Sequence, residues 1–577
     1  MPALQGQVDI FSIAHDITQT EPESDLFHST VLEIMKERGV FEVEDIRRFT
    51  DPDYERDSHD PFLFDDMSTS VDRILRAVSK REKICIYGDY DVDGVCATVI
   101  LYETLIKFGG DVSVRINHRD DEGYGLHANV IDELARSGIS LIITTDQGIS
   151  NTQEVDHATC CGIDTIITDH HTVPDDPEMI PRAVGIIHPR VHADRYPFKD
   201  LSGGGAAFKL AQGIIRTAAP HTREWQYFER WFLDLVCMST LADCVPLVGE
   251  NKVFLHFGLT VLNKMRRVGI RALLSVAPIR TSTITTHSIL FYLSPLLNAA
   301  SRMDHAQLAF DILTVTKLEK AKEIAGILAV HNKERQKLTT RITREAHAQC
   351  KIQTDNQILV GSSPQWPLGV LGLVAGTLVR KYNKPVVLIS EKSDRNIGVA
   401  RSTADIHITR TFQKIEPLFD RFGGHHRAGG FALKEGVSTA EFVNQINGVI
   451  HDEHSAPARD VRDEKIYPLG LHDITLEFAN QLKRCQPWGT GNPEPTFCIP
   501  QCVLTNMSRV GKKMQHLRLH VQQDNERRTM IGIKKGASED ELKVGDILTI
   551  FCHIDIGTWQ GKQDIFIKII DYSKQPV

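Results

Sequence analysis

Three aspartates at alternate positions stand out in the segment Gly88-Asp89-Tyr90-Asp91-Val92-Asp93-Gly94. Carboxylates this close repel one another, and a divalent cation is their usual counter-charge. The aspartates follow the apolar run Ile84–Tyr87, which is typical of a strand, and precede a helical pattern from Val95 to Phe108. The segment therefore predicts a metal site at the end of a strand.

Further acidic and imidazole side chains follow other apolar runs. Leu141–Thr145 precedes Asp146, Thr165–Thr168 precedes Asp169-His170-His171, and the later segment Leu235–Leu241 precedes Ala242-Asp243. A lone Asp after a strand is usually a helix cap or a turn residue, and for Asp146 alone we favour that role. Taken together, the residues favour metal ligation. The candidate ligands are Asp89, Asp91, Asp93, Asp146, His170 and Asp243.

The donor types indicate which ions fit. Carboxylates with an imidazole suit Mn²⁺ or Mg²⁺, whereas a zinc site would show more His or Cys. The ligand set is larger than one ion needs, which predicts two ions about 3.5–4 Å apart that share a carboxylate. Such a pair favours in-line attack of a metal-activated water on a phosphorus centre.

The strand candidates alternate with helical patterns, including an amphipathic helix over Met67–Ser79. The other strand candidates are Val112–Ile116 and Val184–Ile187. Continuous β-branched runs between helices predict an α/β fold with a parallel sheet covered on both faces. Sites in such sheets form beyond the carboxyl ends of the strands. The predicted fold thus brings the candidate ligands to one edge.

Length and composition limit the possible classes. A chain of 577 residues is too long for one ordinary core, so we expect several domains. Hydrophobic residues make up 41% and charged residues 24%, and the net charge is −9, which excludes a protein coated in basic surface. The eleven cysteines form no CxxC pair, which indicates reduced thiols in the cytoplasm. Neither a signal peptide nor a membrane-length apolar run is apparent.

The middle of the chain reads as a helical link and a second α/β unit. A small-residue loop over Leu293–Arg302 suits contact with phosphate, or packs on the core with an exposed Arg. The charged pattern Asp311–Cys350 predicts a solvated spacer helix. Glycine-rich turns are expected over Gly398–Ser402 and Arg421–Gly430, either as phosphate cradles or as tight strand turns.

A polar stretch over His454–Asp463 predicts a linker, and the segments beyond it predict a small β-barrel of the OB type. Its basic and aromatic residues suit a groove for single strands, although an ordinary β-domain with a charged surface remains an alternative. The groove candidates are Lys512, Lys513, His516, Arg518, Lys534, Lys535, Trp559 and Lys562.

Several motifs are similar to those of a known family. Gly88–Gly94, Asp146-Gln147-Gly148, Asp169-His170-His171 and Ala242-Asp243 resemble the four motifs of the DHH phosphoesterase superfamily. Further segments resemble the bacterial RecJ branch of this superfamily. The resemblance extends over roughly residues 70 to 575. These segments are His118–Leu126, Leu297–Arg302, Phe422–His425 and Cys485–Pro495.

The resemblance implies domains, a function and partners. It implies a lead-in over 1–66, a DHH domain over 67–312, a linker helix over 313–352, a DHHA1 domain over 353–453 and an OB-like domain over 460–577. The implied activity is 5′-to-3′ digestion of single-stranded DNA with two Mn²⁺ or Mg²⁺ ions, in DNA repair and recombination. Implied partners are single-stranded DNA, a helicase and a single-strand-binding protein, with the chain itself a monomer.

The resemblance also implies residue roles. Asp146 is the implied bridging carboxylate, Asp169 orients an imidazole, and His171 contacts the scissile phosphate or assists the leaving oxygen. Implied substrate-binding residues are Arg119, Tyr124, Asn298, Arg302, Arg401, Gly423, Gly424 and His425. This sequence departs from the usual family residues at Gln147, Leu296, Pro367 and Val399.

Two other functions stay open from the sequence. A phosphodiesterase or phosphatase for small nucleotides or short oligonucleotides shares the DHH and DHHA1 domains but does not usually carry the C-terminal barrel. A non-catalytic DNA-binding relative should have lost the metal aspartates, which are all present here.

Overall fold

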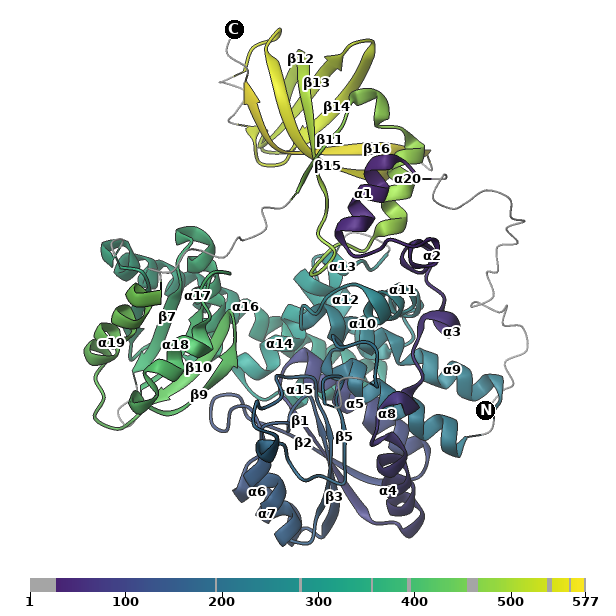
Figure 1. Ribbon diagram of the computed structural model, residues 1–577, viewed down its shortest axis with the longest axis vertical. Helices are drawn as coiled ribbons and strands as arrows, with labels where there is room; N and C mark the ends of the chain where they lie inside the picture. The colour runs from purple at the N-terminus through teal and green to yellow at the C-terminus, as the bar shows by residue number, and fades with distance from the viewer. Residues whose placement is uncertain are drawn as a thin grey trace. The chain divides into compact units, whose positions relative to one another are not determined.

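The chain divides into two units. The barrel unit comprises Met1–Pro52, Lys465–Trp488 and Glu494–Val577, and the sheet unit comprises Asp53–Glu464 and Gly489–Pro493. The computed structural model in Figure 1 describes residues 27–191, 195–219, 221–279, 283–353, 356–391, 396–453, 465–536, 542–559 and 562–574. The first 26 residues and the linker predicted over His454–Asp463 lie outside this part.

Five strands form the first sheet of the sheet unit, in the order β2-β1-β3-β4-β5. Every pairing is parallel. Helices α6 and α7 pack on one face, and α4, α5 and α8 lie on the other (Figure 1). The strands are β1 Lys83–Gly88, β2 Asp111–Ile116, β3 Ile139–Thr145, β4 Asp164–Thr168 and β5 Gly185–Ile187. The helices are α4 Met67–Lys80, α5 Val92–Lys107, α6 Ala128–Arg136, α7 Thr152–Cys160 and α8 Gly203–Ala218.

The predicted parallel α/β fold is therefore confirmed. All five predicted strands are present, and α4 matches the helix predicted over Met67–Ser79. The continuous apolar runs arise because helices cover both faces, so that almost every residue of β3 and β4 is buried.

Helices complete the first part of the sheet unit. Before the sheet lies α3 Tyr54–Asp57. After it lie α9 Arg223–Trp231, α10 Leu233–Ala242, α11 Gly249–Asn263, α12 Val268–Val276, α13 Thr286–Ser288, α14 Ser294–Met303 and α15 Gln307–Thr314. The spacer helix is α16 Leu318–Cys350. It starts later than predicted because Val315 adopts an extended conformation after α15. No residue from 329 to 341 is buried, as a solvated spacer requires.

The loop predicted over Leu293–Arg302 is wrong, because this segment is helical. A π-helical turn over Ile289–Leu293 leads directly into α14. Pro295 lies in the first turn of α14, where a missing N–H breaks no helical hydrogen bond. The buried Ala299 and Ala300 present little bulk, which suits the close contact of α14 with α16.

A second sheet follows α16, in the order β6-β7-β8-β10-β9. Only the β6–β7 pair is parallel, and the other pairs are antiparallel. The strands are β6 Leu359–Ser363, β7 Val386–Glu391, β8 Asn396–Arg401, β9 Phe419–His425 and β10 Ala428–Leu433. The helices are α17 Leu368–Tyr382, α18 Ile408–Lys414 and α19 Thr439–Glu453.

The two predicted glycine-rich turns are largely strands. Gly398 lies in β8, and Gly423-Gly424 and Gly429-Gly430 face each other across the β9–β10 pair. A Cβ at Gly398 would lie 2.3 Å from the Phe431 ring. These glycines therefore make room for core aromatics and for close strands, rather than freeing amides in a loop.

The barrel unit contains six strands in the order β11-β12-β13-β14-β16-β15, and an additional β12–β15 pairing closes the barrel. The predicted OB-like barrel is thus confirmed. The strands are β11 Ile466–Pro468, β12 Thr496–Val510, β13 His516–Gln523, β14 Glu526–Gly532, β15 Ile547–Trp559 and β16 Lys562–Lys574. Its helices are α1 Ser29–Glu37, α2 Val43–Thr50 and α20 Leu476–Cys485.

The core of the barrel unit combines both ends of the chain. Val31, Ile34 and Phe49 from α1 and α2 are buried in one cluster with Phe478 and Phe497. The backbone N–H of His28 donates to Gln481 Oε1 at 2.7 Å. The sequence pattern did not join these segments, because pairing across more than 400 residues leaves no local periodicity.

Candidate metal centre

The turn after β1 carries the three alternating aspartates. Asp91 caps α5, since its Oδ1 accepts from the N–H groups of Asp93 at 2.8 Å and Gly94 at 3.2 Å. A Cβ at Gly94 would lie 2.6 Å from the carbonyl oxygen of Asp89, so only glycine permits this tight turn. The capping role of Asp91 occupies one carboxylate oxygen and is compatible with ligation by the other.

Asp93 is held by the start of α8. Its carboxylate accepts from the N–H groups of Gly203 at 2.8 Å and Gly204 at 2.7 Å, and from the Ser239 hydroxyl at 2.5 Å. Helix N-terminal amides favour a negative charge at this point. A Cβ at Gly203 would lie 2.5 Å from Asp146 Oδ1. Sequence analysis missed these supports, although the run Ser202-Gly-Gly-Gly205 offered a signal.

His170 draws three carboxylates together. Its Nε2 lies 3.1 Å from Asp146 Oδ1, 3.6 Å from Asp93 Oδ2 and 3.7 Å from Asp243 Oδ2. Asp146 follows β3 with a positive φ of 61°, and its N–H donates to the Thr168 carbonyl at 2.9 Å. Residues from three adjacent strand ends therefore meet at one edge, as predicted.

Asp243 reaches this edge from a helix. It directly follows α10, in which every residue from Leu233 to Leu241 is buried. The segment Leu235–Leu241 is largely apolar because the helix is surrounded by other elements. Periodicity therefore did not reveal its helical form.

Asp146 links two potential ligand groups. The donor atoms of Asp89, Asp91 and Asp146 lie within 4.8 Å of one another, and so do those of Asp93, His170 and Asp243. Asp146 also contacts His170 of the second group. Asp89 Oδ1, Asp146 Oδ1 and His170 Nε2 are buried without a hydrogen-bond partner in the described part of the chain. Unpartnered buried donors and acceptors of this chemistry fit divalent cations.

The electrostatics of the cluster point the same way. Burial and the charge of Asp91 raise the pKa of Asp89 to about 7. Burial and the charge of Asp93 raise the pKa values of Asp91, Asp146 and Asp243. Bound cations relieve both effects, because they replace water around the carboxylates and balance their charge.

Asp169 forms a second layer behind the imidazoles. Its Oδ1 accepts from the N–H groups of His170 and His171 and lies 2.8 Å from His171 Nδ1, while its Oδ2 accepts from the Ile149 N–H at 3.0 Å. Burial lowers the pKa of His171, but the charge and hydrogen bond of Asp169 outweigh this effect and raise it to about 9. Burial and the charge of His171 lower the pKa of His170, which suits a neutral metal ligand.

Gln147, one of the departures from the family pattern, is fully buried behind the site. Its Nε2 donates to the Tyr87 carbonyl at 3.0 Å, and its Oε1 accepts from the Gly125 N–H at 3.1 Å. The neighbouring Tyr124 hydroxyl lies 3.0 Å from His171 Nδ1. Gln147 thereby ties the end of β1 to the loop that brings Tyr124 to the imidazole.

Gln147→Leu is expected to lower the free energy of unfolding by about 1–3 kcal/mol, because it strands a buried carbonyl and a buried N–H. Turnover should fall as well, since the Tyr124 loop loses its anchor. Urea unfolding and steady-state kinetics measure the two effects. Gln147→Glu keeps the acceptor for Gly125 but places a carboxylate against the Tyr87 carbonyl, so it should be destabilised as well. Equal stability of Gln147→Leu and the wild type would contradict the anchoring role.

Arginines from separate elements gather beside the carboxylates. Burial and the charges of Arg119, Arg335 and Arg401 hold the pKa of Arg302 well below its ordinary value. Like charges this close call for an anionic partner. Arg119, Arg302 and Arg401 are residues that the family resemblance implied. Arg335 lies on α16, which we expected chiefly as a solvated spacer and only secondarily as a helix whose basic residues line the path of a strand.

Glycines on α17 make room for two of these arginines. Arg302 Nη1 donates to the Gly369 carbonyl at 2.7 Å, and a Cβ at Gly369 would lie 2.8 Å from the Arg302 carbonyl oxygen. A Cβ at Gly372 would lie 2.9 Å from Arg401 Nη2. Asn298, also on α14, has a buried Oδ1 without a partner in the described part of the chain.

The remaining departures and substrate-binding candidates lie in regular structure. Leu296 is buried in α14, Val399 packs beside a core cluster, and Pro367 precedes α17. Gly423 and Gly424 lie in β9, and no hydrogen bond of the described residues joins them to the carboxylates. His425 ends β9, and its side chain lies outside the described part.

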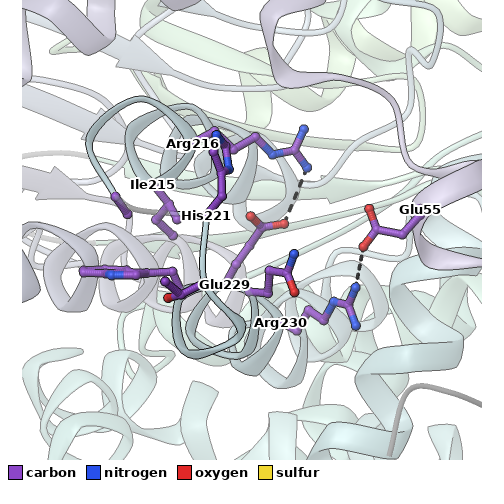
Figure 2. A pocket seen from close by; sticks show the side chains of 10 residues that line it. Glu55, Ile215, Arg216, His221, Glu229 and Arg230 are labelled. Carbon is purple, nitrogen blue, oxygen red and sulfur yellow. Dashed lines mark hydrogen bonds and ion pairs between the residues drawn. The ribbon is translucent and has the colours of Figure 1, made fainter. Parts of the chain in front are cut away.

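A separate pocket of about 200 Å³ lies between α3, α8 and α9 and shares no residue with the carboxylate cluster (Figure 2). Its charges balance internally, since Arg216 pairs with Glu229 at 3.6 Å and Arg230 pairs with Glu55. We assign it no part in the chemistry of the metal centre.

The fold and the site define a DHH-type phosphoesterase with two further domains. Residues 83–240 match the N-terminal domain of the DHH family, residues 355–452 match the DHHA1 domain, and residues 467–571 match the RecJ OB domain. The chain belongs to the RecJ family of single-stranded-DNA-specific exonucleases.

Similar proteins that match most of the chain support this assignment. The chain is 31% identical to the single-stranded-DNA-specific exonuclease RecJ of Bacillus subtilis (strain 168), covering 94% of this chain and 67% of that protein. It is 30% identical to the single-stranded-DNA-specific exonuclease RecJ of Haemophilus influenzae, and the match covers 78% of this chain and 80% of that protein. The crystal structure of RecJ in complex with Mn²⁺ from Thermus thermophilus has the same fold, with a TM-score of 0.76 and 24% sequence identity. The match covers 96% of this chain and 79% of that chain.

Proposed function

We propose that this chain hydrolyses single-stranded DNA from its 5′ end and releases mononucleotides, in DNA repair and recombination. The observation that carries the proposal is the pair of ligand groups that Asp146 links, with buried donor and acceptor atoms that have no hydrogen-bond partner in the described part of the chain. The OB barrel favours a long single strand over a small nucleotide as substrate, because such barrels track a strand by charge and stacking.

In this proposal the two ligand groups would hold two Mn²⁺ or Mg²⁺ ions. Asp89, Asp91 and Asp146 would hold one, and Asp93, Asp146, His170 and Asp243 would hold the other. Such ions, when bound, supply Lewis-acid activation of water and stabilise charge on the phosphate oxygens. The amides of Gly203 and Gly204 hold the Asp93 carboxylate in a fixed orientation, so that its ligand geometry is set before substrate arrives.

His171 would act on the scissile phosphate. The hydrogen bond from Nδ1 to Asp169 fixes the ring, and together with the charge of Asp169 it raises the pKa of His171. Its Nε2–H can then donate to a phosphate oxygen or give its proton to the leaving oxygen. Asp169 holds this orientation through hydrogen bonds from backbone amides and does not itself need to exchange a proton.

The arginines would bind the phosphates of the strand end. Arg119 stacks on the Tyr90 ring at 4.6 Å, which fixes its guanidinium beside the metal centre. Phosphate in this position neutralises the mutual repulsion of Arg119, Arg302 and Arg401, and bidentate contacts fix its orientation. Asn298 and Tyr124 would complete these contacts, and Gly423, Gly424 and His425 would lie along the strand.

Arg119→Met is expected to weaken binding of 5′-phosphorylated single strands by about 10- to 100-fold, because a charge-assisted hydrogen bond contributes about 1.5–3 kcal/mol. Fluorescence anisotropy without turnover measures the dissociation constant. Arg76→Met removes an exposed arginine from α4 and serves as the matched control. An equal loss of affinity in both variants would show that Arg119 contributes only through the overall charge of the protein and not through a specific contact with the phosphate.

Labelled strands test the function directly. Single-stranded DNA labelled at the 5′ or the 3′ end is digested beside duplex DNA and RNA, with Mn²⁺ or Mg²⁺. The proposal expects early release of the 5′ label and slow duplex digestion. Release of the 3′ label first contradicts the polarity. Equal rates on a dinucleotide and a long strand favour a small-nucleotide phosphodiesterase instead.

We further propose that the chain works as a cytoplasmic monomer with a helicase and a single-strand-binding protein. All eleven cysteines are free, which suits a reducing compartment. No helix in the described part is long and apolar enough to cross a membrane. Light scattering tests the monomer, and co-elution on single-stranded DNA tests the partners. The side chains of Trp559 and Lys562, predicted for the barrel groove, lie outside the described part.

A further inference from the structure

Asp132, His157 and Cys161 converge at a second point of the sheet unit. His157 Nε2 lies 2.8 Å from Asp132 Oδ1 and 3.8 Å from Cys161 Sγ, and Cys161 Sγ lies 3.9 Å from Asp132 Oδ1. Asp132 belongs to α6, and the other two residues lie near the end of α7. The DHH centre lies near the start of α7, so the two clusters occupy opposite ends of this helix.

The geometry favours a shared ion over a proton relay. A Cys–His–Asp relay places the thiol and the carboxylate on opposite ring nitrogens. Here both approach the same nitrogen, Nε2, which has room for only one linear hydrogen bond. The spacing of four residues puts His157 and Cys161 on the same side of α7. The three ligand atoms lie within 4.8 Å of one another.

The distances lie close to those of a tetrahedral zinc site, and small side-chain shifts would bring the three ligand atoms to them. Zn–S bonds of about 2.3 Å and Zn–N or Zn–O bonds of about 2.0–2.1 Å place the ligand atoms about 3.3–3.6 Å apart. The observed separations of 2.8, 3.8 and 3.9 Å lie on both sides of this range. A thiolate, an imidazole and a carboxylate suit Zn²⁺ better than the harder Mn²⁺ or Mg²⁺. The side chains of His157 and Asp132 are 37% and 52% exposed, so an ion can enter from solvent.

We propose that Asp132, His157 and Cys161 form a zinc site separate from the DHH centre. Three protein ligands leave the fourth position to water. The ion would clip α6 to α7. The loop that carries Tyr124 leads into α6, and the turn that carries Asp146 leads into α7, so the clip would hold together the helices behind both residues. This inference does not depend on the proposed exonuclease activity.

Cd²⁺ is the probe, because a cadmium–thiolate bond gives an ultraviolet charge-transfer band that carboxylate ligands cannot give. The metal-free full-length protein is titrated with Cd²⁺ and then with Zn²⁺ in competition. We expect one thiolate-bound Cd²⁺ that Zn²⁺ displaces and that excess Mg²⁺ does not. Cys161→Ser should remove the band. His157→Gln should weaken binding by more than the roughly 10- to 100-fold that loss of an outer partner costs.

Cys160→Ser is the matched control, since Cys160 is exposed beside Cys161 and does not belong to the cluster. Asp146→Asn is the second control, because it disrupts the DHH centre and should keep the band. Digestion of single-stranded DNA in Mn²⁺ should be unchanged in Cys161→Ser. Absence of the band in the wild type, or an unchanged band in both Cys161→Ser and His157→Gln, would overturn the proposal.

Discussion

Asp146→Asn is expected to lower kcat on single-stranded DNA by on the order of 10³-fold, because loss of a bridging ligand removes several kcal/mol of metal-derived stabilisation. Asp146 belongs to one ligand group with Asp89 and Asp91, and its Oδ1 lies 3.1 Å from His170 in the other. A neutral amide keeps the shape of the side chain but binds a hard cation weakly. Both ion sites should therefore lose affinity together, which Mn²⁺ titration of the activity measures.

The stability of the metal-free protein should not fall in Asp146→Asn, in contrast to its activity. In EDTA, Asp146→Asn should be at least as stable as the wild type, because it removes one of several buried carboxylates that repel one another. Urea unfolding measures this, and the exposed Asp111→Asn on β2 serves as the control. Wild-type kcat in Asp146→Asn would exclude the bridging role. A large loss of stability would instead point to a structural role.

The second large effect is expected in the pH dependence of the metal-free protein. Burial and the charge of Asp91 raise the pKa of Asp89 from 3.8 to about 7. The folded state then binds a proton more tightly than the unfolded chain. The contribution of Asp89 to the free energy of unfolding is therefore fully present below about pH 4 and is lost as the pH rises through about 7. At about 1.4 kcal/mol per pKa unit, Asp89 alone accounts for up to about 4 kcal/mol.

Urea unfolding in EDTA across this pH range tests the effect. Asp89→Asn carries no titrating group at this position, so the difference in stability between variant and wild type should grow as the pH rises. Saturating Mn²⁺ should remove most of the slope in the wild type, because bound cations replace the protons. Parallel pH profiles for wild type and Asp89→Asn in EDTA would show that Asp89 does not titrate in this range.

Much of the metal centre could be predicted from the sequence, because the relevant information is local. A buried parallel strand gives a continuous apolar run, and the residue after it must lie at the carboxyl edge of the sheet. This pattern places Asp89, Asp146 and His170 together from the sequence alone. Asp243 belonged to the same set, but its helix is buried on all sides and shows no 3.6-residue period.

Other parts of the site depend on contacts between distant residues and could not be predicted. The amides of Gly203 and Gly204 reach Asp93 across 110 or more residues. Arg335 joins the arginine cluster only because α16 passes beside it. The glycines of β8 to β10 resembled turn residues, since a glycine that admits a Phe ring and a glycine that opens a loop look identical in sequence.

The barrel core has a consequence for how the protein is made. His28 and Gln481 are 453 residues apart, and α1 and α2 contribute to the same buried cluster as β12. A ribosome that adds about 5–20 residues per second needs roughly 20–90 s between these two points. The apolar faces of α1 and α2 therefore stay without their packing partners during synthesis, until the C-terminal part of the chain has emerged from the ribosome. A fragment that starts at Lys465 would expose the other side of this core and should be prone to aggregate.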